Sequence, residues 1–202
     1  MKTGYRAITL AALLLLMLGC SSGEDEAPTP TPTAEPTPTV QPSPTAWTAD
    51  GIISEGEYAS SQTHGGHEIH WTTDGQYIYA ALRATTSGWV AVAVQPGQRM
   101  KNADMVFGFV SDGETTVIDM FSTGDFGPHP PDEDQGGTND ILEYGGTEVN
   151  GVTTIEFKRA LVTGDDYDND LKPGPNKIIW SYGSNDDPSQ KHVERGYGEL
   201  DL

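Results

Sequence analysis

Short β-rich runs, each bounded by turn residues, follow one another from Trp47 to the end of the chain. They are rich in Val, Ile, Thr and aromatic residues, and Gly, Asn and Asp separate them. No long window keeps the apolar period of an amphipathic helix. This pattern predicts an all-β fold, an antiparallel immunoglobulin-like β-sandwich, because strands alternating with helices would show such windows. The predicted strands lie within His67–Thr73, Gln76–Thr85, Gly88–Val94, Ala103–Val110, Thr115–Ser122, Thr147–Leu161, Asn176–Ser184 and Gly196–Leu202.

The N-terminal part of the chain has a different character. Lys2 and Arg6 precede the apolar stretch Ala7–Leu18, which is too short to span a membrane and is typical of a secretory signal, predicted over residues 1–19. Cys20, the single cysteine, follows directly, as in a bacterial or archaeal lipoprotein whose cysteine becomes the lipid-modified N-terminus. The alternative is an ordinary signal peptide cut nearby, which would leave a free thiol outside the cell.

Residues 20–46 predict an extended, solvated linker. The segment holds seven of the fourteen prolines and no aromatic residue, so it cannot bury a core. Residues 47–202 are enough for one domain with its own core, without a disulfide. Together the segments predict an extracytoplasmic domain, attached to the cell membrane or cell surface through a lipid on Cys20.

The chain is strongly acidic, with 30 acidic against 11 basic residues and a formal net charge of −19. Such a charge argues against nucleic acid and anionic lipid surfaces as partners, because both repel it. A protein that docks on this chain is expected to present a basic surface.

One methionine lies outside the apolar runs. Met105 and Met120 fall within predicted strands, and Met105 shares the parity of its aromatic neighbours, so we expect it in the core. Met100 instead follows a Pro-Gly turn and lies between Arg99 and Lys101. A thioether in a charged turn either packs back under the loop or binds a ligand.

His192 has a comparable position, in a polar loop before the last predicted strand, beside Lys191 and close to Arg195. A thioether and an imidazole are the axial pair that holds a six-coordinate haem iron. The flanking cations would be available to pair with the haem propionates. Met100 and His192 therefore form a candidate pair of metal ligands.

Several segments carry a resemblance to a known family: "DGIISEGEY", "GWVAVAVQPGQRMKNADMVFGFV", "TTIEFKRALVTGDDYDNDL", "NKIIWSYG" and "HVERGYGELDL". In this order they resemble the DOMON superfamily, and in particular its haem-binding b-type cytochromes, such as the cytochrome domain of cellobiose dehydrogenase. The resemblance implies that Met100, in an M-x-x-A-D pattern, and His192, in an H-x-x-R-G pattern, are the axial ligands. No Cys-x-x-Cys-His motif is present, so the haem would be held without covalent bonds.

With both axial positions filled by protein, the implied function is electron transfer rather than catalysis, and we expect no enzyme activity. No nucleophile motif, pair of carboxylates or metal triad points to an active site. The predicted cofactor contacts are Met100, His192, Arg99, Lys101, Lys191 and Arg195, with Trp89, Phe107, Trp180 and Tyr182 as candidates for the pocket walls.

A haem-free alternative remains, because some DOMON domains lack haem and bind sugars, and "DGIISEGEY" also resembles the start of carbohydrate-binding β-sandwich modules. In that case Trp and Tyr side chains would stack on sugar rings. A colourless protein that binds polysaccharide would favour this function.

Two other groups have the spacing of metal ligands. His64, His67 and His70 lie close in sequence, but His67 and His70 should point to opposite faces of a strand, so polar positions on a half-exposed edge strand explain them better than a metal site. The remaining histidine, His129, lies in a Pro-Gly-Asp loop and is expected at the surface.

Asp166, Asp168 and Asp170 alternate in an acidic loop and could offer oxygens to calcium. The glycine and distal glutamate of an EF-hand loop are absent, and acidic loops in so negative a chain are usually only solvated. The sequence leaves both possibilities open, a calcium site and a solvated acidic loop.

Overall fold

A computed structural model describes residues 47–202. The predicted signal sequence, Cys20 and the linker of residues 20–46 lie outside the described residues, so they stay predictions, as do the domain boundaries. No helix within residues 47–202 is both long and apolar enough to cross a membrane.

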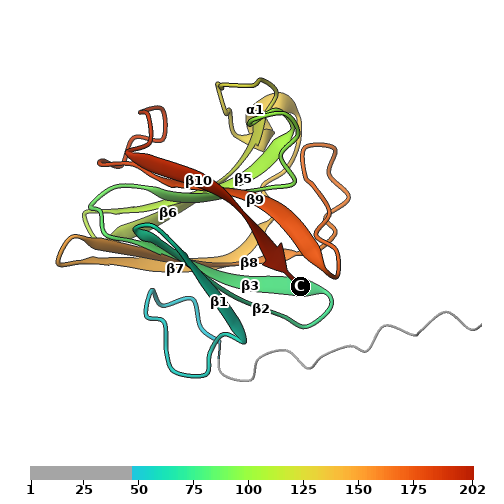
Figure 1. The fold of residues 1–202 in the computed structure, drawn as a ribbon. Helices are drawn as coiled ribbons and strands as arrows, with labels where there is room; N and C mark the ends of the chain where they lie inside the picture. The colour runs from blue at the N-terminus through green and yellow to red at the C-terminus, as the bar shows by residue number, and fades with distance from the viewer. Residues whose placement is uncertain (1–46) are drawn as a thin grey trace, which may run out of the picture. The chain divides into compact units, whose positions relative to one another are not determined.

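Ten strands form two antiparallel five-stranded sheets that pack face to face (Figure 1). The first sheet has the order β1-β2-β3-β8-β7 and the second the order β10-β9-β4-β5-β6. The strands are β1 (Ser60–His64), β2 (His67–Thr73), β3 (Tyr77–Ala84), β4 (Val90–Val94), β5 (Ala103–Ser111), β6 (Glu114–Ser122), β7 (Ile141–Val149), β8 (Val152–Ala160), β9 (Pro175–Tyr182) and β10 (Glu194–Asp201). A four-residue helix, α1 (Asp132–Gln135), lies between β6 and β7. The predicted all-β sandwich is confirmed.

The inner faces of the sheets form the main core. Alternate residues of each strand point inward, as in β4, where Val90, Val92 and Val94 join the core while Ala91 and Ala93 point outward. The first sheet contributes Ile69, Trp71, Ile78, Leu82, Ile155 and Phe157, and the second contributes Val106, Val110, Val117, Ile178, Trp180 and Leu200. The sandwich therefore needs only one face of each sheet for its core.

Part of the outer face of the first sheet is covered by residues 47–58, the first part of the chain that the structure describes. The Glu156 carboxylate, fully buried, accepts hydrogen bonds from the Asp50 and Gly51 backbone N–H groups at 2.9 and 2.6 Å, and from the Tyr58 hydroxyl at 2.6 Å. The indole of Trp47 donates to the Tyr58 oxygen at 2.9 Å and packs edge-on against Tyr79. This part of the face is closed by polar contacts.

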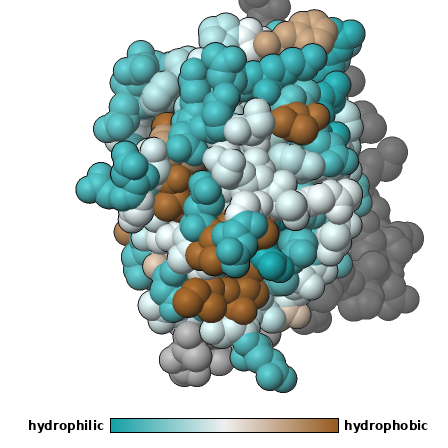
Figure 2. All heavy atoms as spheres, turned by 90° about the vertical axis from the view of Figure 1, so that its left-hand side faces the viewer, coloured by the Kyte–Doolittle hydropathy of each residue, from teal (hydrophilic) through white to brown (hydrophobic). Residues whose placement is uncertain are grey.

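Hydrophobic side chains at the surface form separate groups between hydrophilic ones, as the end view in Figure 2 shows. Isolated exposed apolar residues are ordinary in folded proteins. The large ones are Ile52, Phe126, Leu142, Tyr144, Val149, Val162, Val193 and Tyr197. Of these, Phe126 and Tyr197 line the cavity described next.

Candidate cofactor site

A cavity of about 980 Å³ lies over the outer face of the second sheet. Its floor is apolar and comes from outward-facing residues of the four adjacent strands β9, β4, β5 and β6 and their ends: Trp89, Ala91, Ala93, Met105, Phe107, Ile118, Met120 and Ile179. Two loops rise beside it, residues 125–131 before α1 and residues 187–192 before β10 (Figure 1). An outer sheet face that is apolar and hollowed can hold a large apolar ligand.

Met100 and His192 reach this cavity from opposite ends of the sheet. Strand β4 pairs with β9 so that Val90 lies opposite Tyr182 and Val94 lies opposite Ile178. The loop with Met100 follows Val94, whereas the loop with His192 follows Tyr182. Both side chains line the same cavity. The fold therefore brings together the two predicted ligands, which are far apart in sequence.

The turn that carries Met100 is tight and internally bonded. The Gly97 N–H donates to the Lys101 carbonyl at 2.8 Å, and the Ala103 N–H donates to the Met100 carbonyl at 3.0 Å. Arg99 and Asn102 both adopt a left-handed backbone, with φ of 58°, within the turn that joins the antiparallel strands β4 and β5. These bonds fix the backbone on both sides of the thioether.

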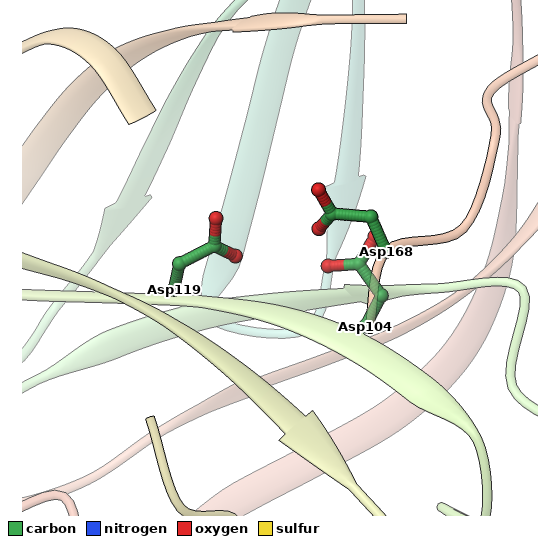
Figure 3. A group of neighbouring side chains, drawn as sticks. All are labelled: Asp104, Asp119 and Asp168. Carbon is green, nitrogen blue, oxygen red and sulfur yellow. The ribbon is translucent and has the colours of Figure 1, made fainter. Parts of the chain in front are cut away.

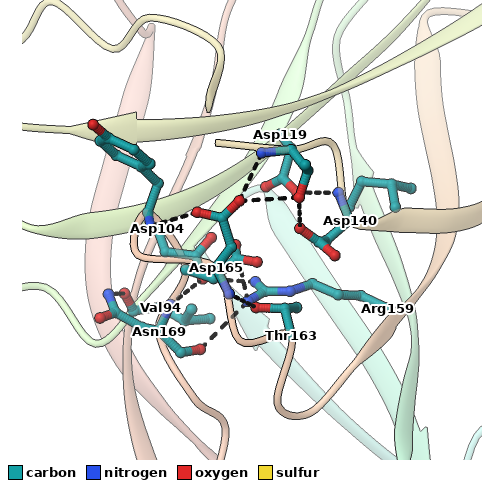
Figure 4. A network of polar contacts seen from close by, with 12 residues as sticks. Val94, Asp104, Asp119, Asp140, Arg159, Thr163, Asp165 and Asn169 are labelled. Carbon is teal, nitrogen blue, oxygen red and sulfur yellow. Dashed lines mark hydrogen bonds and ion pairs between the residues drawn. The ribbon is translucent and has the colours of Figure 1, made fainter. Parts of the chain in front are cut away.

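A buried ion pair anchors this turn from below (Figure 4). Arg159 reaches from β8 in the first sheet and binds the Asp104 carboxylate, with 2.7 Å between Nη1 and Oδ2. Asn169 donates from its backbone to the same carboxylate oxygen at 2.9 Å and from its side chain to the Asn102 carbonyl at 2.8 Å. The position of Met100 thus depends on contacts between the two sheets.

Asp104, Asp119 and Asp168 gather around Arg159, with carboxylate oxygens within 4.8 Å of one another (Figure 3). Burial raises the pKa of Asp119 to about 7 and that of Asp168 to about 6, although the Arg159 guanidinium opposes both shifts. Burial also raises the pKa of Asp132, in α1, to about 8. Near neutral pH some of these carboxyl groups are therefore protonated, and the cluster carries less than its full negative charge.

The calcium ligand set expected in the acidic loop is not formed. Asp166 and Asp170 are exposed, whereas Asp168 turns inward and lies 3.2 Å from the Arg159 guanidinium. Alternating residues of this loop point in different directions, and the inward one already has a cationic partner.

The His192 imidazole is half-buried in the cavity wall. Burial lowers its pKa, and the charges of Arg195 and Lys191 lower it further. A neutral imidazole has a free nitrogen lone pair, as a metal ligand requires. Three cations line the cavity, namely Arg99, Lys191 and Arg195. The predicted contact Lys101 is exposed and does not line it.

Two of the four candidate wall residues lie in the cavity. Trp89, only 2 % exposed, packs against Phe107 with 4.9 Å between ring centroids. Its indole lies against Gly183, where a Cβ would collide with the ring, so only glycine allows this approach. Trp180 points into the core between the sheets, and the Tyr182 hydroxyl donates to Glu194 at 2.7 Å. Strand alternation places Trp180 on the opposite face from Ile179, a floor residue.

Two further expectations need correction. Met105 is buried, but it belongs to the cavity floor and not to the core between the sheets. His129 is not a surface residue: its ring lines the cavity and lies 6.4 Å from the Phe107 ring, nearly parallel to it. The loop before α1 folds over the sheet, which its Pro-rich composition alone does not reveal.

The three neighbouring histidines do not converge. His67 points inward, fully buried, and packs 5.8 Å from the Trp180 ring, while His70 points outward beside Glu68. His64 stacks on Trp180 at 5.7 Å and interacts with Gln62. The strand alternation predicted for His67 and His70 is observed.

Residues 63–183 match the DOMON domain family, and this span covers more than half of the chain. The chain belongs to the DOMON domain family. Met100 lies within the matched span, whereas His192 lies just beyond it. The family resemblance noted from the sequence is confirmed.

Two solved structures share the fold at low sequence identity. The cytochrome domain of Myriococcum thermophilum cellobiose dehydrogenase matches with a TM-score of 0.53 and 16% identity, covering 71% of this chain and 78% of the other. The cytochrome b domain of pyranose dehydrogenase from Coprinopsis cinerea matches with a TM-score of 0.50 and 15% identity, covering 67% and 76%. These matches establish the fold.

Two proteins that are similar in sequence are much longer than this chain. DBH-like monooxygenase protein 1 of Mus musculus is 31% identical over 127 residues, which span 62% of this chain and 20% of the relative. MOXD1 homolog 1 of Drosophila melanogaster is 31% identical over 111 residues, covering 54% and 16%. The aligned region thus spans about a fifth of these relatives, so their activity as whole proteins does not transfer to this chain.

Proposed function

We propose that the protein is an extracytoplasmic, lipid-anchored b-type cytochrome that binds one haem through Met100 and His192 and transfers single electrons. The observation that carries the proposal is that these two residues, from opposite ends of the second sheet, line one apolar cavity. The cytochrome domains among the structural neighbours, in the same fold, support it.

The cavity fits such a cofactor in size and chemistry. Its volume of about 980 Å³ lies at the upper end of the range for small-molecule and cofactor sites. Its floor is apolar, and its donor set combines a thioether with imidazole, which suits a haem iron. Two buried polar atoms in its wall, Trp89 Nε1 and His129 Nδ1, have no hydrogen-bond partner within residues 47–202.

Each group of residues has a defined task in this proposal. Met100 and His192 would hold the iron from its two sides and leave no position for oxygen or substrate, so we propose no enzyme activity for this chain. Bound haem would supply a one-electron iron couple, and a thioether ligand favours its reduced state. Arg99, Lys191 and Arg195 would pair with the propionates.

The charge distribution suits a protein partner. Within the proposal the cations of the cavity are paired with propionates, so the remaining acidic surface would attract a redox partner with a basic docking face. Attachment through Cys20 would keep this encounter at the membrane or cell surface. Nucleic acid is not a partner in this proposal.

The test is a visible absorption spectrum of the full chain, expressed with haem supply, before and after reduction with dithionite. We expect a low-spin b-type spectrum with a sharpened α-band on reduction. Met100→Leu should abolish low-spin six-coordination, and His192→Ala should lower the low-spin fraction well below that of the wild type. Met120→Leu, on the cavity floor, and His70→Ala, on the outer face of the first sheet, are the matched controls and should keep the wild-type spectrum.

A wild-type-like spectrum in both ligand variants would overturn the ligand assignment. A protein that stays colourless after addition of haem would overturn the proposal itself. Retention of that colourless protein on immobilised polysaccharide would then favour the haem-free carbohydrate-binding module.

A further inference from the structure

The cavity contains a second imidazole besides that of His192. Besides Met100 and His192, it is lined by His129, which extends from the loop between β6 and α1. Its Nδ1 is buried and has no hydrogen-bond partner among the described residues. Burial lowers the pKa of His129, and the charge of the nearby His192 lowers it further.

The loop that carries His129 is firmly attached to the sheet. Phe121, in β6, donates from its N–H to the Pro130 carbonyl at 3.2 Å, and the Gln135 side chain donates to the Phe121 and Pro130 carbonyls, both at 3.3 Å. The Tyr167 hydroxyl donates to the Gln135 carbonyl at 2.8 Å. Prolines on both sides of His129 restrict its backbone further. The imidazole is therefore held over the cavity floor in a defined place.

The His129 ring lies over the cavity floor and close enough to His192 for their charges to interact, although its loop is anchored nearer the Met100 end, where Pro131 bridges to Met120. The His129 ring stacks near Phe107, which pairs with Ala91 in β4. The next pair of β4, Val90 with Tyr182, is where β9 ends and the loop to His192 begins. Met100 enters from the other end. The cavity thus offers two neighbouring imidazoles in addition to the thioether of Met100.

We propose that His129 is a second imidazole donor of this site, able to take the iron position of His192. The inference rests on the proposed haem-binding function. It assigns the loop of residues 125–131 a direct role at the cofactor, where a reserve ligand would retain the haem whenever His192 leaves the iron. The cavity would then hold its cofactor through either of two loops.

The test compares the full chain with His192→Ala, His129→Ala and the double variant His129→Ala/His192→Ala, each with haem supplied. The matched control is His70→Ala/His192→Ala, because His70 lies on the outer face of the other sheet. Absorption and electron paramagnetic resonance spectra report the spin state. We expect His129→Ala to stay low-spin. His192→Ala and the control double variant should each keep a low-spin fraction. The double variant His129→Ala/His192→Ala should lose this low-spin fraction.

A second measurement separates loss of a ligand from loss of the fold. Added imidazole should restore a low-spin spectrum to His129→Ala/His192→Ala, and the rate of haem transfer to apomyoglobin should be faster for this variant than for His192→Ala. Equal high-spin spectra and equal transfer rates for these two variants would overturn the inference while leaving the proposed function intact. A wild-type protein that binds no haem would overturn both.

Discussion

The two outer faces of the sandwich have opposite characters, although the sheets have the same number of strands and share one core. The first sheet is partly covered by residues 47–58, whose backbone and Tyr58 hydroxyl are bound by the buried Glu156. The second sheet is apolar outside as well as inside and carries a cavity of about 980 Å³ between two loops. Neither outer face is needed for the main core, so one is partly closed by the chain itself and the other is kept for a ligand.

The contrast predicts that the contacts between residues 47–58 and the first sheet, called the polar cover below, can be weakened without disturbing the cavity. Glu156→Gln removes the charge from three hydrogen bonds at a fully buried position, and we expect a loss of about 2 kcal/mol in the free energy of unfolding. The spectrum of the haem-loaded protein should stay unchanged, because Glu156 lies outside the cavity. Chemical denaturation and absorption spectroscopy measure the two effects.

Glu143→Gln is the matched control for this variant. Glu143 lies on the same sheet and pairs with Lys158 at 2.8 Å, but its side chain is 57% exposed. Loss of such a pair costs about 0.5 kcal/mol or less. If Glu156→Gln loses no more unfolding free energy than the control, the polar cover contributes little to stability. A changed spectrum of haem-loaded Glu156→Gln would show that the two outer faces are coupled.

Two buried groups, one in each sheet, should respond to pH with opposite signs. Burial raises the pKa of Asp119, in β6, to about 7, so between pH 4 and 7 the folded protein keeps a proton that the unfolded chain releases. The stability contribution of Asp119 therefore falls as pH rises through this window. Burial lowers the pKa of His67, in β2, to about 3, so its contribution falls as pH drops below about 6.5.

Each group changes the free energy of unfolding by at most about 1.4 kcal/mol per pH unit. Relative to wild type, Asp119→Asn should gain stability from pH 5 to pH 8, whereas His67→Leu should show its larger relative gain at pH 5. Denaturant unfolding of the haem-free proteins at both pH values measures the differences. The same sign for both variants would contradict the assignment of these buried groups.

The smallest expected effect is a difference in haem retention between variants of two cations in one turn, Arg99 and Lys101. Arg99 lines the cavity and stacks on the exposed Phe126 ring at 4.2 Å, whereas Lys101 does not line the cavity. Arg99→Gln should weaken haem retention by about 1 kcal/mol or less, and Lys101→Gln should leave it unchanged. Competition for haem with apomyoglobin gives the comparison. Equal losses for both variants would mean that general charge, not position, holds the propionates.

Most strands could be predicted because their side chains alternate or are β-branched, as in β3 and β8. The strand β1 and most of β7 were not, and these are the two edges of the first sheet. β1 is wholly polar, and β7 contains Gly145 and Gly146 at its centre. Edge strands bury little, so their sequences carry a weak signal.

The candidate site shows the same division. Strand alternation places Trp89, Ala91 and Ala93 on one face, but both faces of β4 are buried, so the sequence pattern cannot say which one lines a cavity. His129 was missed because its loop has no periodic pattern, and its position depends on hydrogen bonds to β6.

By itself, the sequence determined the fold class, the strand parity and the candidate ligands Met100 and His192, because these depend on local periodicity, residue chemistry and short motifs. The tertiary structure decided which face of the second sheet carries the cavity. It also decided that the loops of Met100 and His192 both line this cavity, together with His129. Those features arise from strand pairing and from contacts such as Arg159 with Asp104, between residues far apart in the chain. No local pattern encodes such contacts, because each depends on how the two sheets pack.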